Sequence, residues 1–177
     1  TGGVPRREIG LTLSSAKTVE QWAQGFRTYM GAFLAWEDGQ IRVIPNVPST
    51  DVDMVITADD ILKGSLKLNR RSLRTVPNSV IIEYLDASGS KWTQERVQVD
   101  SPRVTSGAET RRPSRISLPG IHNASQAARE ATERLNWYIT DLDASLTIFD
   151  EGFALQNGSI VEVSHPIGLE SKKFRVV

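Results

Sequence analysis

The chain has 177 residues, enough for one domain or two small lobes, and it contains no cysteine. Disulfide bonds, thiol nucleophiles and thiolate metal sites are therefore excluded. Twenty-one basic and 21 acidic residues cancel, so the chain has no overall field to attract a polyanion, and its near-zero net charge mildly favours self-association. No apolar run approaches the roughly 18 residues that a membrane-spanning helix needs. We expect a fragment of a larger chain, because the first residue is not methionine and the last four residues fall within a predicted strand.

A helix followed by a hairpin is predicted near the start of the chain. Thr18 and Gln21 have the spacing of a capping box, and apolar residues then recur at helical spacing. This stripe comprises Val19, Trp22, Phe26, Met30 and Phe33, whose aromatic members we expect in the core. Gly31 is expected to end the helix. The dipeptide Asp38-Gly39 then predicts a tight turn between two short strands.

The middle of the chain is predicted to be mostly β-structure. Residues 56–60 resemble a helical turn, and residues 62–68 resemble an edge strand that Gly64 weakens. Alternating apolar residues predict an antiparallel pair from 80–85 and 92–99. A long polar connection follows.

The last third of the chain predicts strand, turn, helix and two further strands. A strand around Ile116 leads to the turn dipeptide Pro119-Gly120, and Asn123 has the position of a helix cap with Gln126 three residues later, where its side chain can reach back to the cap. The helix is predicted over 124–140. Its apolar stripe is rich in alanine, which suits close packing on a sheet: Ala127, Ala128, Ala131, Leu135 and Tyr138. Two strands are expected on either side of the Asn157-Gly158 turn.

These elements predict an α+β protein, because strands occur in hairpins and the two amphipathic helices do not alternate with single strands. We expect mostly antiparallel hairpins and small barrel-like sheets. Pro45 and Pro48 mark a boundary between a helix-plus-hairpin lobe at 8–50 and a β-rich lobe at 51–177.

Four segments, taken in order and spacing, resemble the phage tail tip attachment protein family (J-like), within the phage tail proteins. They are Val76–Asp86, Leu118–Ile121, Ser125–Ala128 and Glu151–Gly158. The resemblance runs from about residue 56 to 177 and more loosely over 18–44. Two departures occur: Asn157-Gly158-Ser159 stands where family members commonly have Pro-Gly-Asp, and Val76 stands where an arginine is common.

The resemblance implies a structural virion component with no cofactor and no enzymatic activity. It implies a baseplate-hub region, usually trimeric, that forms a ring at the end of the tail tube and contacts other tail proteins. Assembly would take place in the bacterial cytoplasm, and DNA could pass through the ring.

Seven residues are candidates for interface contacts. Arginines form two clusters, and Trp137 lies off the main stripe of its helix, where an aromatic side chain suits a subunit contact or a second buried surface. The clusters are Arg70, Arg71 and Arg74, and Arg111, Arg112 and Arg115. Three interpretations stay open for them: solvated strand ends or ion pairs between subunits, phosphate contacts to nucleic acid, and the lining of a central conduit.

Other candidate sites are poorly supported by the sequence. His122 and His165 have no metal-ligand spacing and are expected in loops. The acidic pairs Asp141/Asp143 and Asp150/Glu151 would be needed for a cell-wall hydrolase, the weakest alternative. A carbohydrate-binding module is the stronger alternative, with Trp92 or Trp137 stacking on sugar rings.

Overall fold

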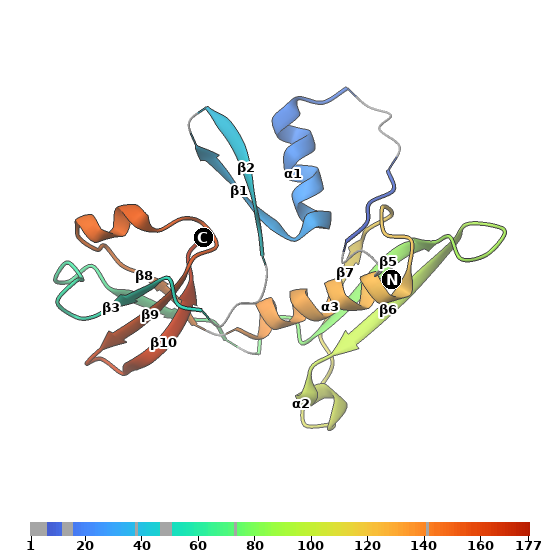
Figure 1. Ribbon diagram of the computed structural model, residues 1–177. Helices are drawn as coiled ribbons and strands as arrows, with labels where there is room; N and C mark the ends of the chain where they lie inside the picture. The colour runs from blue at the N-terminus through green and yellow to red at the C-terminus, as the bar shows by residue number, and fades with distance from the viewer. Residues whose placement is uncertain (1–6, 12–15, 38, 47–50, 73, 141) are drawn as a thin grey trace. The chain divides into compact units, whose positions relative to one another are not determined.

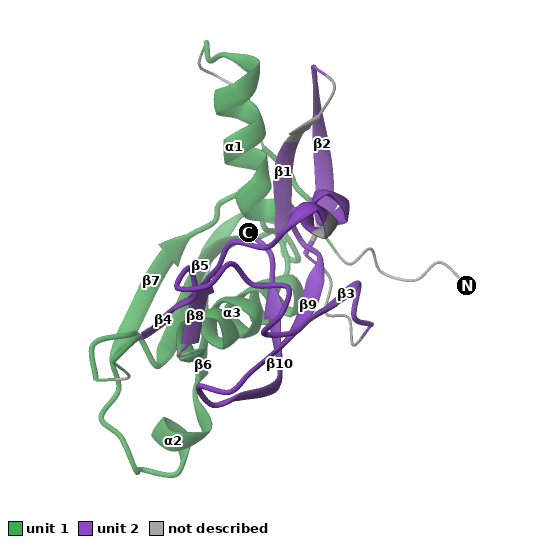
Figure 2. Cartoon of the chain, turned by 90° about the vertical axis from the view of Figure 1, so that its left-hand side faces the viewer, with its two compact units in different colours: residues 1–29, 71–141 green, residues 30–70, 142–177 purple. Residues whose placement is uncertain are grey.

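The computed structural model describes residues 7–11, 16–37, 39–46, 51–72, 74–140 and 142–177. They form two compact units, which Figure 2 colours separately. Unit 1 comprises Thr1–Tyr29 and Arg71–Asp141, and unit 2 comprises Met30–Arg70 and Leu142–Val177. This grouping differs from the lobes predicted at 8–50 and 51–177, because the first helix and the hairpin that follows it belong to different units.

Unit 1 is built on a three-stranded mixed sheet in the order β6-β5-β7. The strands are β5 (Ser79–Asp86), β6 (Thr93–Asp100) and β7 (Pro113–Ser117). β6 runs antiparallel to β5, as the alternating pattern predicted, and β7 runs parallel to it. Val80 and Ile82 are fully buried on one face of β5. Because the side chains of a strand alternate between faces, this face needs a cover.

Helix α3 (Ala124–Ile139) provides that cover and packs on β5 and β6 (Figure 1). It begins where the sequence predicted, since the Asn123 side chain accepts a hydrogen bond from the backbone N–H of Gln126 at 2.7 Å. Ala127, Ala131 and Leu135 are buried against the sheet in one hydrophobic core. Each large apolar side chain buried there stabilises the fold by roughly 1.5–3 kcal/mol.

Residues 7–11 lie against the rest of unit 1. The Gln126 side chain does not close a capping box: its Nε2 donates to the Glu8 carbonyl at 2.8 Å, and its Oε1 accepts from the Glu8 N–H at 3.2 Å. Arg7 forms ion pairs with Glu130, which is buried, and with Glu133. A short segment remote in sequence is thus fixed to the start of α3 by paired polar groups.

Helix α1 (Val19–Met30) begins with a complete capping box. The Thr18 hydroxyl accepts from the Gln21 N–H at 3.3 Å, and the Gln21 side chain accepts from the Thr18 N–H at 3.1 Å. The expected aromatic core is wrong here, since no residue of α1 is buried. Trp22 and Phe26 are half-buried and stack on each other with ring centroids 5.8 Å apart.

Unit 2 opens with the predicted hairpin of β1 (Ala32–Glu37) and β2 (Gln40–Pro45). Glu37 pairs with Gln40, which confirms a tight two-residue connection, and Gly39 has a φ of 75°. Asp38 of the predicted turn and Pro48 of the predicted boundary lie outside the described residues. Phe33 is half-buried rather than in a closed core.

The hydrophobic core of unit 2 lies under a sheet in the order β10-β9-β3. Its strands are β3 (Met54–Ile56), β9 (Ile160–His165) and β10 (Leu169–Arg175). The core residues Ile56, Val161 and Val163 come from β3 and β9. The helical turn predicted at 56–60 is wrong, because Ile56 ends a strand and a turn follows.

A separate pair joins β4 (Lys67–Arg70) to β8 (Leu142–Ser145), and η1 (Asp150–Ala154) is a short 3₁₀ helix. The strand predicted at 62–68 is therefore shorter and later in the sequence. The polar connection before β7 contains a further short helix, α2 (Pro102–Thr105). The α+β class is confirmed, but none of the sheets in the described residues closes into a barrel.

Candidate interaction surfaces

Arg111 is held within unit 1 by an acid at the end of β6. Its Nε and Nη2 atoms donate to the two carboxylate oxygens of Asp100 at 3.1 and 2.6 Å. These hydrogen bonds lower the pKa of Asp100 from 3.8 to about 2. The bidentate pair fixes the end of β6 to the segment that leads into β7.

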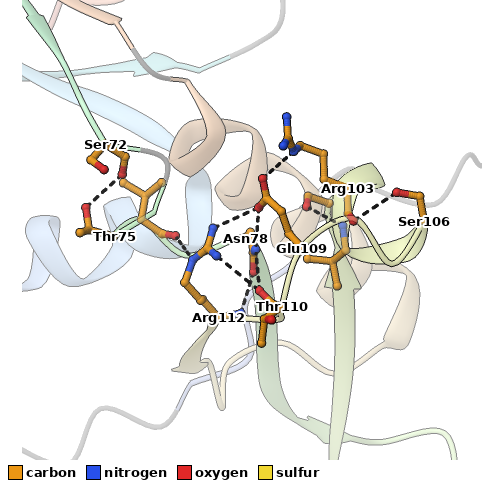
Figure 3. Close-up of polar contacts among 11 residues, drawn as sticks. Ser72, Thr75, Asn78, Arg103, Ser106, Glu109, Thr110 and Arg112 are labelled. Carbon is orange, nitrogen blue, oxygen red and sulfur yellow. Dashed lines mark hydrogen bonds and ion pairs between the residues drawn. The ribbon is translucent and has the colours of Figure 1, made fainter.

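Arg112 belongs to a polar cluster around the buried Asn78 (Figure 3). The Asn78 amide donates to Glu109 and to the Thr110 carbonyl, each at 3.1 Å, and its oxygen accepts from the Arg112 N–H at 2.7 Å. The Arg112 guanidinium donates to Glu109 at 3.1 Å and to the Val76 carbonyl at 3.2 Å. The hydrogen bond from Asn78 lowers the pKa of the Glu109 carboxyl.

Arg103 completes this cluster by pairing with Glu109 at 2.5 Å. Glu109 therefore joins α2 to Asn78, the residue just before β5. Arg111 and Arg112 pair with acids of unit 1, and none of the three interpretations left open by the sequence included these partners.

The other predicted arginines are distributed over both units. Arg70 ends β4 in unit 2, whereas Arg71 and Arg74 belong to unit 1. Arg70 and Arg71 both have interaction partners. Arg74 and Arg115 are exposed, and within the described ranges neither makes an ion pair. The interface role of these arginines stays a prediction.

Large aromatic side chains are exposed on both units. In unit 1, Trp137 is 56% exposed near the end of α3, and Trp92 is 62% exposed beside the ring of His122, with centroids 4.6 Å apart. In unit 2, Phe149 is more than half exposed and Phe153 of η1 is 91% exposed. The sequence indicated only the tryptophans as candidates for contacts, and the exposure of Phe149 and Phe153 was not expected.

Both histidines make hydrogen-bond contacts within the protein. The His122 ring lies between two carbonyl oxygens, with Nδ1 3.2 Å from Leu85 O and Nε2 2.9 Å from Gly10 O. His165 ends strand β9, so its expected loop position is wrong. Among the residues that the structure describes, no group of three His, Asp or Glu side chains has the arrangement of a metal site.

The structure describes only some members of the two acidic pairs. Asp143 lies in β8 and Asp150 in η1. Asp141 and the Glu151 side chain lie outside the described part of the chain. None of the helices within that part has both the length and the apolar composition needed to cross a bilayer.

An apolar notch that was not expected from the sequence lies beside β3. The notch has a volume of about 220 Å³, and Asp60 and Asp150 contribute polar groups to it. Its other lining residues are Met54, Val55, Ile56, Ile148 and Phe149. The signal that could have indicated it is the short apolar run from Met54 to Ile56 between pairs of aspartates.

The fold is similar to those of solved tail proteins. The virion of a native gene transfer agent particle contains a chain with 20% identity and a TM-score of 0.65, and the match covers 90% of this chain and 36% of that one. The tail protein from Neisseria meningitidis MC58 has 14% identity and a TM-score of 0.65, with 94% and 51% covered. The 43 kDa tail protein of prophage MuSo2 from Shewanella oneidensis has 17% identity and a TM-score of 0.61, with 93% and 50% covered.

The chain thus spans between about a third and a half of the length of these relatives. A comparison with curated proteins finds no match. One family model, described as "Putative phage tail protein", matches residues 18–177. Because that match covers nearly the whole sequence, the predicted resemblance is confirmed, and the chain belongs to this family of phage tail proteins.

Proposed function

We propose that the chain is a structural part of a phage or prophage tail tip, in the baseplate hub, and that three copies assemble into a ring at the end of the tail tube. The observation that carries this proposal is the exposure of large aromatic residues on both units of a tail-family protein, with Phe153 at 91%. Contiguous exposed apolar surface is characteristic of contact sites, and aromatic residues are enriched at their centres.

In this role the chain holds neighbouring subunits and other tail proteins together and transforms no substrate. Two cores built independently in the two units give it rigid surfaces to present. DNA would pass through the ring, and the exposed Arg115 on the sheet of unit 1 is a candidate to face it.

The test is the assembly state of the purified 177-residue chain, measured by sedimentation velocity and by class averages of electron micrographs. We expect a concentration-dependent trimer with a central opening. Phe153→Ser should lower the trimer fraction, whereas Val19→Ser, also at a highly exposed position, should not. A monomer at every concentration up to the millimolar range would overturn the proposal.

A carbohydrate-binding module remains a second candidate, because Trp92 offers an exposed ring and packs edge-on against His122. Such a platform suits stacking on a sugar ring. The test is binding to a glycan array, which should be lost in Trp92→Ala and kept in Trp137→Ala. An array without signal, or a signal that survives Trp92→Ala, would remove this candidate.

A further inference from the structure

The β10-β9-β3 sheet of unit 2 has two open edges. β3 forms one edge and β10 the other, and no strand in the described residues pairs with either outer side. β3 has only three residues, whereas β10 has seven and carries exposed residues from Glu170 to Lys173. An open edge presents unpaired backbone N–H and C=O groups, which pair readily with a strand of another chain.

The two edges have opposite charge. Every charged residue from 51 to 60, around β3, is an aspartate: Asp51, Asp53, Asp59 and Asp60. β10 instead carries Lys172, Lys173 and Arg175 against the single acid Glu170. Asp53 and Asp60 accept hydrogen bonds within their own subunit, and Asp51, Lys173 and Arg175 also have partners there, so the complementarity lies in the net charge of each edge. Opposite net charge on the two edges of one sheet favours the pairing of β3 with β10 of a second copy and disfavours pairing between like edges.

Exposed apolar side chains near the two edges also favour pairing with a second copy. The notch beside β3 is lined by Val55, Ile148 and Phe149, and Val55 and Phe149 are more than half exposed. Ile167, in the turn just before β10, is also more than half exposed. A second copy therefore offers an apolar side chain next to a basic strand, and the first copy offers an apolar notch next to an acidic strand.

The directions of the strands allow β3 and β10 of two copies to pair in the antiparallel sense. β3 runs parallel to β9, whereas β10 runs antiparallel to β9. If the β9 strands of two neighbouring copies run in the same sense, β10 of one copy lies antiparallel to β3 of the other. The turn that carries Ile167 then falls beyond Ile56, toward the Asp60 end of the notch.

We infer that β10 of one copy pairs antiparallel with β3 of the next copy and places Ile167 in the notch, so that the sheet continues between subunits. The contact is heterologous, because it joins two different edges, and such contacts close into a ring when the rotation permits. This inference rests on the proposed ring assembly and names the edges that join it.

The absence of cysteine makes disulfide trapping a direct test. Val55 pairs with Glu162, and Glu162 pairs with Lys173, so Val55 and Lys173 lie on the same face of the sheet. Directly opposed residues on adjacent strands are about 4.5–5.5 Å apart at Cα, within the range that a disulfide spans. Lys172 is also exposed but lies on the other face, which makes it the matched control.

The experiment mixes ¹⁵N-labelled Val55→Cys protein with unlabelled Lys173→Cys protein, oxidises the mixture mildly and measures dimers by intact mass. We expect heterodimers to exceed both homodimers, and to exceed by about tenfold those formed with Lys172→Cys. Equal trapping at Lys172 and Lys173 would indicate random collision and overturn the inference.

Assembly measured in parallel separates the two proposals. A ring that forms without the Val55–Lys173 cross-link overturns the edge pairing and leaves the proposed function standing. Loss of both the ring and the cross-link overturns the proposed function and the edge pairing together.

A surface variant provides a second readout. Ile167→Asp should weaken assembly about tenfold or more, because a carboxylate would enter an apolar notch with acidic neighbours. Val43→Asp, at an exposed apolar position on β2 of the same unit, is the control and should assemble normally. Equal assembly of the two variants would contradict the placement of Ile167.

Discussion

Asn78 and Arg112 bind each other through both backbone and side chain. The Arg112 N–H donates to the Asn78 side-chain oxygen at 2.7 Å, and the Asn78 N–H donates to the Arg112 carbonyl at 3.1 Å. Asn78 is buried just before β5, so a polar group that loses its hydrogen bond to Asn78 has little access to water as a replacement. This pair therefore determines how the connection after β6 returns to the sheet.

Replacing Asn78 by alanine should destabilise the protein by about 2–3 kcal/mol, because three side-chain hydrogen bonds disappear and their partners lie in a partly buried cluster. Urea unfolding monitored by circular dichroism measures this. Asn136→Ala, at an exposed position of α3, is the control and should change stability by less than about 0.5 kcal/mol. Similar losses in both variants would show that the cluster contributes little.

Acid should remove the stabilisation that comes from Asp100. Its pKa in the folded protein is about 2, below the ordinary value of 3.8, because Arg111 donates to both carboxylate oxygens. A lowered pKa means that the folded state favours the charged carboxylate, so the contribution is present above 3.8 and is lost as the pH falls toward 2. We expect it to be on the order of 1 kcal/mol, since Arg111 is half exposed and solvent weakens the pair.

The measurement is the free energy of unfolding across this acid range for the natural protein and for Asp100→Asn. The difference between them should shrink on acidification. Arg111→Ala should give the same profile, and the double variant should lose little more than either single one. A difference that is independent of pH would contradict the assignment.

Local capping and turn signals in the sequence correctly predicted where both long helices begin and where the first hairpin turns. Thr18 and Asn123 cap their helices as expected, and the turn at Gly39 joins two paired strands. Each of these signals depends only on residues within a few positions of one another. Their side chains can therefore bond the nearby backbone groups whatever the rest of the fold is.

Contacts between distant residues could not be predicted in the same way. Gln126 has the spacing of a capping box, but it pairs with Glu8, 118 residues away. The partner of Arg111 is Asp100, the last residue of β6. The periodicity of the sequence predicts the end of a strand only to within a few residues, so this partner could not be identified. β3 has three residues and a parallel partner remote in sequence, so its pattern could not be distinguished from a helical turn.

Glycine at position 10 should be required by the close approach of His122. An added Cβ there would lie 2.1 Å from the His122 Nε2 atom, so Gly10→Ala should displace residues 7–11 and destabilise unit 1 by about 1–3 kcal/mol. Hydrogen exchange of the Gly10 region and thermal unfolding measure this.

Gly25 in α1 is the matched control, because nothing lies within 4 Å of its added Cβ. Gly25→Ala should stabilise the protein by about 0.5–1 kcal/mol through helix propensity. If the clash is the cause, Gly10→Ala should destabilise the protein much less in a His122→Ala background than in the natural protein. Destabilisation of equal size in the two glycine variants would contradict the role of His122.

Trp137 should contribute to association rather than to folding. It lies on α3 away from the buried stripe of Ala127, Ala131 and Leu135, and more than half of its surface is exposed. Trp137→Ala should therefore change the free energy of unfolding by less than about 0.5 kcal/mol. If Trp137 is at the centre of an interface, the same substitution should weaken association by about 2 kcal/mol or more.

Trp92→Ala separates a specific contact of Trp137 from a general loss of apolar surface, because Trp92 is exposed to a similar degree on the same unit. Sedimentation equilibrium of the two variants should show weaker association for Trp137→Ala alone. Equal association constants would show that Trp137 lies outside the interface, since removal of a buried aromatic anchor leaves a cavity that the partner cannot fill without moving.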